Sequence, residues 1–198
     1  MWSVDSIREA LARNAPAVTP FQAGPNRAAV AMVLAGDESN LQICFIRRVE
    51  RPGDPWSGHM AFPGGRASVG DSSAQAVAER ETREEVGLIL TESHRIGTLS
   101  EIPIRLGGVD TSMVLSPFVY HVGHEAPAFQ PNEEVAEAYW APLADLWEPK
   151  NATQLTRSSI AFPAIRFHEH LIWGLTLRVL TLFSDLLGAP LPLQIPVW

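Results

Sequence analysis

The chain has 198 residues, of which 46% are hydrophobic and 19% are charged, and its formal net charge is −7. This length and composition fit one ordered domain over residues 1–198 and exclude a largely disordered chain. The acidic balance lacks the basic footprint of a nucleic-acid-binding protein, so no nucleic-acid partner is expected.

The cysteine content and the apolar segments of the chain indicate its cellular compartment. The single cysteine, Cys44, excludes an internal disulfide, and its apolar surroundings at 41–46 favour a buried strand residue over a reactive thiol. No basic segment followed by an apolar stretch marks a signal peptide at the N-terminus. The most apolar late stretch, 171–187, contains Arg178 and Asp185 and is too short and charged for a membrane span. We therefore expect a cytoplasmic protein without a membrane partner.

Taken in chain order, apolar periodicity and turn residues predict many short strands and few helices. An N-terminal helix is expected over about 5–14, with Ser3 or Asp5 as its cap. Strands are expected over 28–34, 41–47, 59–62, 95–99, 113–121, 135–140, 164–167 and 171–173, with a loop over 51–58. Helical segments are expected over 72–86, where Gly87 is a C-terminal stop, over 142–146, and over about 174–187. Without a regular βαβ series, this order favours an α/β or α+β sandwich.

The chemistry of the chain is concentrated in residues 80–88. Glu81, Glu84 and Glu85 stand at i, i+3 and i+4, which places three carboxylates on neighbouring positions of one helical face. Like charges this close repel, and a hard divalent cation such as Mg²⁺ or Mn²⁺ reverses the sign of that interaction. The alternative is a solvated charged helix in which Arg80 and its neighbour Arg83 balance the glutamates.

The segment before this helix favours the metal-site interpretation. Phe62-Pro63-Gly64-Gly65 is a glycine turn whose backbone can approach a metal or phosphate closely, and a loop ending at Gly70-Asp71 leads to the helix. A strand, glycine turn, loop and polycarboxylate helix in this order resembles the Nudix box. That pattern is Gly, five residues, Glu, seven residues, then Arg-Glu-apolar-x-Glu-Glu-x-Gly-apolar.

The helix half of the Nudix pattern matches at six positions: Arg80, Glu81, Glu84, Glu85, Gly87 and Leu88, with Thr82 at the apolar position. The loop half departs, because the loop is one residue longer and the early Glu is missing, with Asp71 as the nearest acidic residue. A lengthened loop with Asp in that place is familiar in the coenzyme A diphosphatase branch of the family. The resemblance covers roughly residues 28–180 and implies an α/β/α sandwich with a mixed β-sheet and a catalytic helix.

The resemblance also implies roles for individual residues. Glu81, Glu84 and Glu85 would bind Mg²⁺ or Mn²⁺, and the carbonyl of Gly64 or Gly65 would contribute a ligand. Arg80 would orient a carboxylate through a bidentate hydrogen bond, or form an ordinary helix salt bridge. With Phe62, the two glycines would contact the substrate, and the enzyme would be a metal-dependent pyrophosphohydrolase.

The general base is either a helix glutamate or a glutamate in a later loop. A helix glutamate accepts the proton in some Nudix enzymes and a late loop glutamate in others. Glu133 and Glu134 precede a predicted strand that ends in an aromatic residue, a Pro and a Leu, as in such enzymes. The alternative for both is a surface turn.

The segment before the glycine turn departs from the coenzyme A diphosphatase branch. His59 stands where Gln is usual, and no Arg occupies the usual Leu-Arg place. Arg47, Arg48 and Arg51 could contact phosphates instead, or remain solvated charges. Trp56 could stack on a base or cover the core.

The expected partner is a small nucleoside diphosphate derivative. Coenzyme A would give 3′,5′-ADP and phosphopantetheine, and ADP-ribose, dinucleotides and nucleotide sugars are the alternative substrates. A catalytically silent Nudix-fold sensor is the alternative of another class, but the chain retains all three helix glutamates and has no basic appendage. A homodimer is left open.

Overall fold

The computed structural model describes residues 2–54, 56–106 and 109–195, so Pro55 of the predicted 51–58 loop lies outside the described residues. The helices are α1 (Val4–Arg13), α2 (Ala74–Val86) and α3 (Gly174–Leu186), with 3-10 turns at Glu92–His94, Leu143–Trp147 and Pro149–Asn151. The strands are β1 (Arg27–Ala35), β2 (Gln42–Arg48), β3 (Met60–Ala61), β4 (Gly64–Arg66), β5 (Arg95–Thr98), β6 (Ile102–Leu106), β7 (Val109–His121), β8 (Val135–Pro142), β9 (Ala152–Arg157), β10 (Ile160–Phe167) and β11 (His170–Trp173).

In the described part of the chain, eight strands form one mixed sheet with β1 at its centre. β1 runs parallel to β7, whereas its other neighbours, β2 and β4, are antiparallel to it. β4 pairs with the first half of β1, where Val30 lies opposite Gly64, and β2 pairs with the second half, where Leu34 lies opposite Ile43. The glycine turn is therefore fixed to the central strand.

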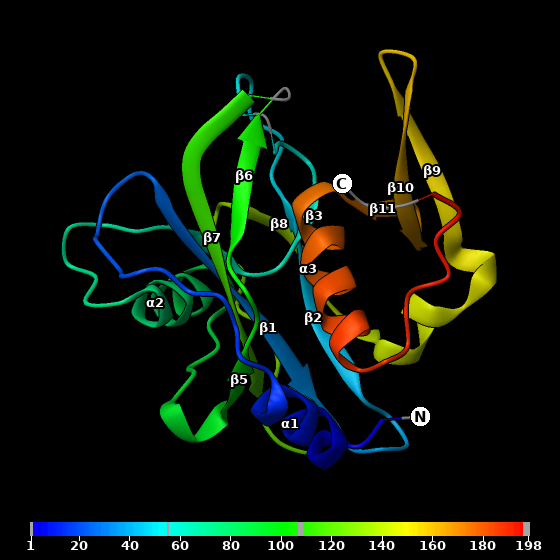
Figure 1. Cartoon of the computed structure of the whole chain (residues 1–198), viewed down its shortest axis with the longest axis horizontal. Coiled ribbons are helices and arrows are strands. Elements are labelled where there is room, and N and C mark those ends of the chain that lie inside the picture. The colour runs from blue at the N-terminus through cyan, green and yellow to red at the C-terminus, as the bar shows by residue number, and fades with distance from the viewer. Residues whose placement is uncertain (1, 55, 107–108, 196–198) are drawn as a thin grey trace.

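Helices cover both faces of this sheet because side chains alternate along β1. Odd-numbered β1 residues pack toward α2, and even-numbered ones pack toward α1 and α3. Figure 1 shows α2 and α3 on opposite sides of the sheet. The first cluster includes Ala29, Ala31, Val33, Val77 and Val86, and the second includes Met32, Leu34, Ile7, Leu11, Leu177 and Phe183. The expected α/β/α sandwich with a mixed sheet is confirmed.

A second sheet of three antiparallel strands, in the order β11-β10-β9, extends beside α3 (Figure 1). Its last strand, β11, leads directly into α3. Ile172 of β11 is fully buried in the same core cluster as α3, whereas the next residue, Trp173, is only half-buried. This strand therefore brings one aromatic side chain toward the surface of the main domain.

The predicted helices and most predicted strands are present within a few residues of their expected bounds. Three strands were missed. β4 contains two glycines, β6 contains Pro103, and β9 is a polar strand with no fully buried residue. Glycine is depleted in strands, a proline inside a run argues against a strand, and a strand that buries no residue has no clear apolar face to identify it. Cys44 is fully buried in β2, as expected.

Within the described ranges, no helix combines the length and hydropathy needed to cross a bilayer.

Candidate active site

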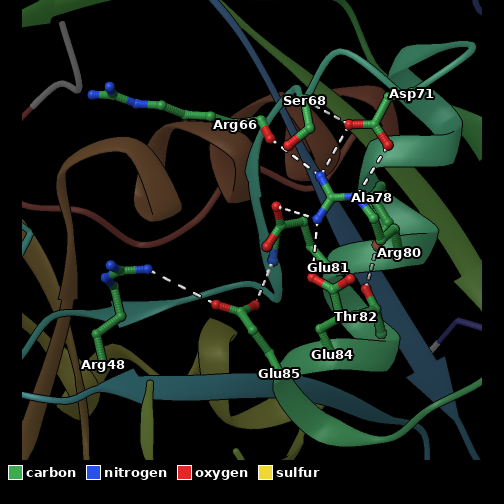
Figure 2. Close-up of polar contacts among 11 residues, drawn as sticks. Arg48, Arg66, Ser68, Asp71, Ala78, Arg80, Glu81, Thr82, Glu84 and Glu85 are labelled. Atoms are coloured by element: carbon green, nitrogen blue, oxygen red, sulfur yellow. Dashed lines mark hydrogen bonds and ion pairs between the residues drawn. The ribbon is translucent and has the colours of Figure 1, made fainter. Parts of the chain in front are cut away.

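The carboxylate helix α2 has a defined start and end. The Ser73 hydroxyl accepts a hydrogen bond from the Ala76 N–H at 3.1 Å, and Gly87 ends the helix with φ at 76°, a conformation that favours glycine. Val77 and Val86 are buried against the sheet. These contacts fix the rotation of the helix, so that Glu81 and Glu85 lie beside the glycine turn (Figure 2).

Two glycines allow this close approach. A Cβ on Gly64 would lie 2.3 Å from the Ala29 carbonyl oxygen, so only glycine fits against β1 here. The Gly64 N–H donates to Glu85 Oε2 at 2.8 Å. A Cβ on Gly65 would lie 2.5 Å from Cδ of Glu81. The missing side chain of Gly65 therefore provides the space that the Glu81 carboxylate occupies.

Arg80 connects the loop before the helix to the helix carboxylates (Figure 2). Its Nε and Nη2 donate to the two oxygens of Asp71 at 3.0 Å each. Its Nη1 donates to Glu81 Oε1 at 2.8 Å and to Glu84 Oε2 at 3.0 Å. The expected bidentate contact of Arg80 is present, and its partner is Asp71, the acidic residue of the lengthened loop. The Arg80 guanidinium holds the pKa of the Asp71 carboxyl below its usual value.

Glu85 is the most buried of the described carboxylates, with 2% of its surface exposed. Burial raises the pKa of Glu85 to about 8, against the opposing effect of the Gly64 N–H. Nη1 of Arg48 lies 3.9 Å from Glu85 Oε1, too far for a hydrogen bond, so it offsets little of that burial. Burial also raises the pKa of Glu81, although Arg80 opposes this shift. Burial therefore disfavours the ionised form of both carboxyls in the absence of a cation.

The chemistry of these groups fits a divalent metal ion. Carboxylate and backbone carbonyl oxygens are the ligands that hard cations prefer, and a cation would offset the cost of burying Glu81 and Glu85 in ionised form. Among the described residues, no three Asp, Glu, His or Cys side chains converge as a preformed metal site. Two of these carboxylates share a donor, because Arg80 Nη1 donates to one oxygen of Glu81 and to one of Glu84.

A cavity of about 490 Å³ opens beside these groups. Its lining includes charged residues, namely Glu81, Glu85, Glu134, Arg48, Asp54 and Arg66. It also includes apolar residues, namely Met60, Phe62, Ile104, Met113, Leu115, Leu175 and Val179. The backbone of Gly64 and Gly65 also lines it, as do Trp56, His59 and Trp173. The cavity can therefore hold a charged group and an uncharged arm of the same ligand.

The structure brings some predicted residues to the cavity and not others. Arg48 lines it, whereas Arg47 and Arg51 do not. Arg47 forms an ion pair with Glu137 on β8 at 2.7 Å, and Arg51 forms one with Glu134 at 3.1 Å. Of the three arginines that could contact phosphates, Arg48 is therefore the one whose position at the cavity suits that role.

The predicted glutamates also differ in whether they line the cavity. Glu134 lines the cavity, but Glu133 does not. Glu84 does not line the cavity either. It pairs with Arg80, and 47% of its side chain is exposed. Glu79 also does not line the cavity, and it accepts hydrogen bonds from Gln75 and Tyr120.

Several residues that line the cavity are not predicted as site residues from the sequence. Arg66 and Asp54 were not considered as site residues, although Arg66 directly follows the glycine turn. The sequence predicts Trp173 only as the end of the strand over 171–173, whereas in the structure its ring lies edge-on to His59 with ring centroids 4.7 Å apart. Position next to the glycine turn could have identified Arg66, whereas Trp173 is brought to the cavity only by tertiary folding.

Comparison with known proteins agrees with this geometry. A family model described as NUDIX domain matches residues 25–161. The chain is 37% identical over 164 residues to the uncharacterized protein C14C4.10c of Schizosaccharomyces pombe, with 73% of this chain and 50% of that protein covered. It thus spans half the length of that relative. It is 32% identical over 183 residues to the mitochondrial coenzyme A diphosphatase NUDT8 of Homo sapiens, with 89% and 75% covered.

Among solved structures, a MutT/nudix family protein from Enterococcus faecalis superposes with a TM-score of 0.58 at 17% identity, with 98% of this chain and 80% of that chain covered. This likeness bears on the fold alone. The family model and the Nudix hydrolase relatives support the expected enzyme class, a pyrophosphohydrolase. Because the family model covers more than half of the chain, the protein belongs to the Nudix domain family.

Proposed function

We propose that this protein is a divalent-metal-dependent pyrophosphohydrolase that cleaves the diphosphate bond of a nucleoside diphosphate derivative, with coenzyme A as its preferred substrate. One observation carries the proposal. Glu81 and Glu85 lie against the backbone of the glycine turn and form the charged wall of a cavity of about 490 Å³. This places buried carboxylates where a bound diphosphate can reach them.

The residues of the site have two roles, metal binding and the positioning of the metal ligands. Glu81, Glu84 and Glu85, with the Gly65 carbonyl, would hold Mg²⁺ or Mn²⁺, which supplies an acidified water and neutralises diphosphate charge. Arg80 positions Glu81 and Glu84, and Asp71 fixes Arg80. These contacts keep the carboxylates close together in spite of their mutual repulsion.

Glu134 is the loop glutamate that can accept a proton from the attacking water. It lines the cavity, whereas Glu133 does not. The Glu134 N–H donates to Asn132 Oδ1 at 2.8 Å, and its carboxylate pairs with Arg51 at 3.1 Å. These contacts hold Glu134 at the rim of the cavity, which supports its assignment as general base over Glu133.

Two observations favour coenzyme A within the class of nucleoside diphosphate derivatives. The related NUDT8 is named a coenzyme A diphosphatase. The apolar wall, with Met60, Phe62, Leu175 and Val179, suits the long uncharged arm of coenzyme A better than the second sugar of ADP-ribose or of a nucleotide sugar.

A substrate panel tests the proposal. Purified protein is incubated with coenzyme A, ADP-ribose, dinucleotides and nucleotide sugars, each with Mg²⁺ or Mn²⁺, and products are identified by mass. We expect coenzyme A to give 3′,5′-ADP and 4′-phosphopantetheine with the highest kcat/KM. A wide preference for ADP-ribose or a dinucleotide would overturn the coenzyme A assignment, and cleavage of none of these compounds would overturn the hydrolase assignment.

A further inference from the structure

The arginines around the cavity differ in their charge partners. Arg47, Arg48, Arg51 and Arg80 each form an ion pair with a carboxylate, at 2.7–3.1 Å. Arg66 lines the cavity and has no carboxylate partner among the described residues. A cavity-lining guanidinium without an internal partner is available to an anionic group of a ligand.

The backbone of Arg66 is fixed close to the carboxylates. Arg66 lies opposite Ala28 in the pairing of β4 with β1, and its carbonyl accepts a hydrogen bond from Arg80 Nη2 at 3.3 Å. Figure 2 shows that its side chain extends away from Glu81 and Glu84. The cation is therefore directed to a part of the cavity other than the one where the diphosphate would meet the carboxylates.

An aromatic ring lies beside this cation. The guanidinium carbon of Arg66 is 5.9 Å from the ring centroid of Trp56, which also lines the cavity. The backbone N–H of Trp56 donates to Asp54 Oδ1 at 2.9 Å, and Arg48 Nη2 donates to Asp54 Oδ2 at 3.1 Å. Arg48 and Asp54 thus hold the loop so that the indole lies next to Arg66.

We propose that Trp56 and Arg66 form the subsite for the nucleotide half of the substrate, where Trp56 packs against the base and Arg66 binds a phosphate on the ribose. This inference rests on the proposed function and deepens it. The aromatic face offers stacking, and the planar guanidinium matches the geometry of a phosphate monoester. Because Arg66 points away from the carboxylates, it meets the ribose phosphate and not the scissile diphosphate. Arg66 then distinguishes coenzyme A from dephospho-coenzyme A.

Binding of two nucleotides without metal tests the subsite separately from turnover. Affinities for 3′,5′-ADP and 5′-AMP are measured by titration calorimetry for the wild type, Arg66→Gln and the control Arg47→Gln. We expect Arg66→Gln to weaken 3′,5′-ADP about tenfold or more, the equivalent of one charge-assisted hydrogen-bonded contact, and to leave 5′-AMP nearly unchanged. Arg47→Gln should change neither affinity, since Arg47 does not line the cavity.

Trp56→Leu should weaken both nucleotides to a similar extent, because both carry the base. An equal loss of both nucleotides in Arg66→Gln would overturn the ribose-phosphate assignment, and no loss would overturn the subsite. The two proposals fail separately. Coenzyme A cleavage without a selective effect of Arg66→Gln refutes only the subsite. A selective binding effect without cleavage of any diphosphate refutes only the hydrolase.

Discussion

Arg80 and Asp71 form a two-point contact in which Nε and Nη2 of the arginine each donate to a different carboxylate oxygen at 3.0 Å. Asp71 is nearly buried, with 6% of its side chain exposed. The remaining nitrogen of the guanidinium reaches both Glu81 and Glu84. One residue in the loop therefore determines how two carboxylates of the helix are oriented.

Asp71→Asn should weaken this arrangement. The substitution removes the charge that holds Arg80, and we expect the free energy of unfolding to fall by about 1–3 kcal/mol, as for a charge-assisted hydrogen bond in a mostly buried setting. Urea denaturation measures the change. The control Glu9→Gln removes the exposed pair between Glu9 and Arg13, whose side chains are 71% and 73% exposed, and it should have almost no effect. Equal effects of the two variants would contradict the role given to Asp71.

Gly65→Ala should lower activity without unfolding the protein. The added Cβ would lie 2.5 Å from Cδ of Glu81, so the carboxylate must move. We expect weaker metal activation, seen as a higher Mg²⁺ or Mn²⁺ concentration at half-maximal rate. Gly70→Ala is the matched control, because a Cβ at Gly70 meets no heavy atom within 4 Å. Similar metal dependence in the two variants would show that Glu81 does not need this space.

Glu85→Gln should change how the stability of the metal-free protein depends on pH. Burial raises the pKa of Glu85 from 4.5 to about 8, so the folded state keeps a proton that the unfolded chain loses. Between these pH values the folded state binds more protons, and the free energy of unfolding therefore falls as the pH rises. Glutamine cannot ionise, and it can still accept the hydrogen bond from the Gly64 N–H. The variant should be more stable than the wild type near pH 8.

Denaturant unfolding in chelator from pH 5 to 8 measures this effect. The contribution of Glu85 should disappear in the variant, which leaves a flatter curve than that of the wild type. Parallel curves for the two proteins would contradict a raised pKa for Glu85. With metal, the same variant should lose turnover by on the order of a hundredfold, since a charged ligand at the reacting centre is removed.

Glu134→Gln should lower kcat, whereas Glu133→Gln should not. Only Glu134 lines the cavity, and the two residues are adjacent, so each is a control for the other. Loss of a general base typically costs about 10²–10⁴ in rate. Steady-state kinetics across pH measure the difference. A wild-type rate for Glu134→Gln would return the role of base to a helix glutamate.

The parts of the site that depend on local spacing were predictable from the sequence. The i, i+3, i+4 spacing places Glu81, Glu84 and Glu85 on one side of α2, and Gly87 ends the helix as expected. The order of glycine turn, loop and helix also indicated the family. Such features depend on neighbours in the chain, and a pattern of residue types is enough to identify them.

The charge partners of the arginines were not predictable in this way. Arg47 lies opposite Glu137 only because β2 pairs with β8 in that register, and Arg51 meets Glu134 across 83 positions of sequence. These contacts neutralise two cations that seemed available to the substrate. Within the described part of the chain, Arg66 has no carboxylate partner. Tertiary folding decides which charged residues meet, and the local sequence does not reveal it.

The central claim is metal-dependent cleavage of a diphosphate at the carboxylate wall of the cavity. The most direct measurement incubates exhaustively chelated protein with coenzyme A, adds Mg²⁺ or Mn²⁺, and follows the products by mass. We expect no turnover in chelator, and 3′,5′-ADP with 4′-phosphopantetheine once metal is restored. Full turnover in the absence of metal, or no cleavage with metal present, would contradict it.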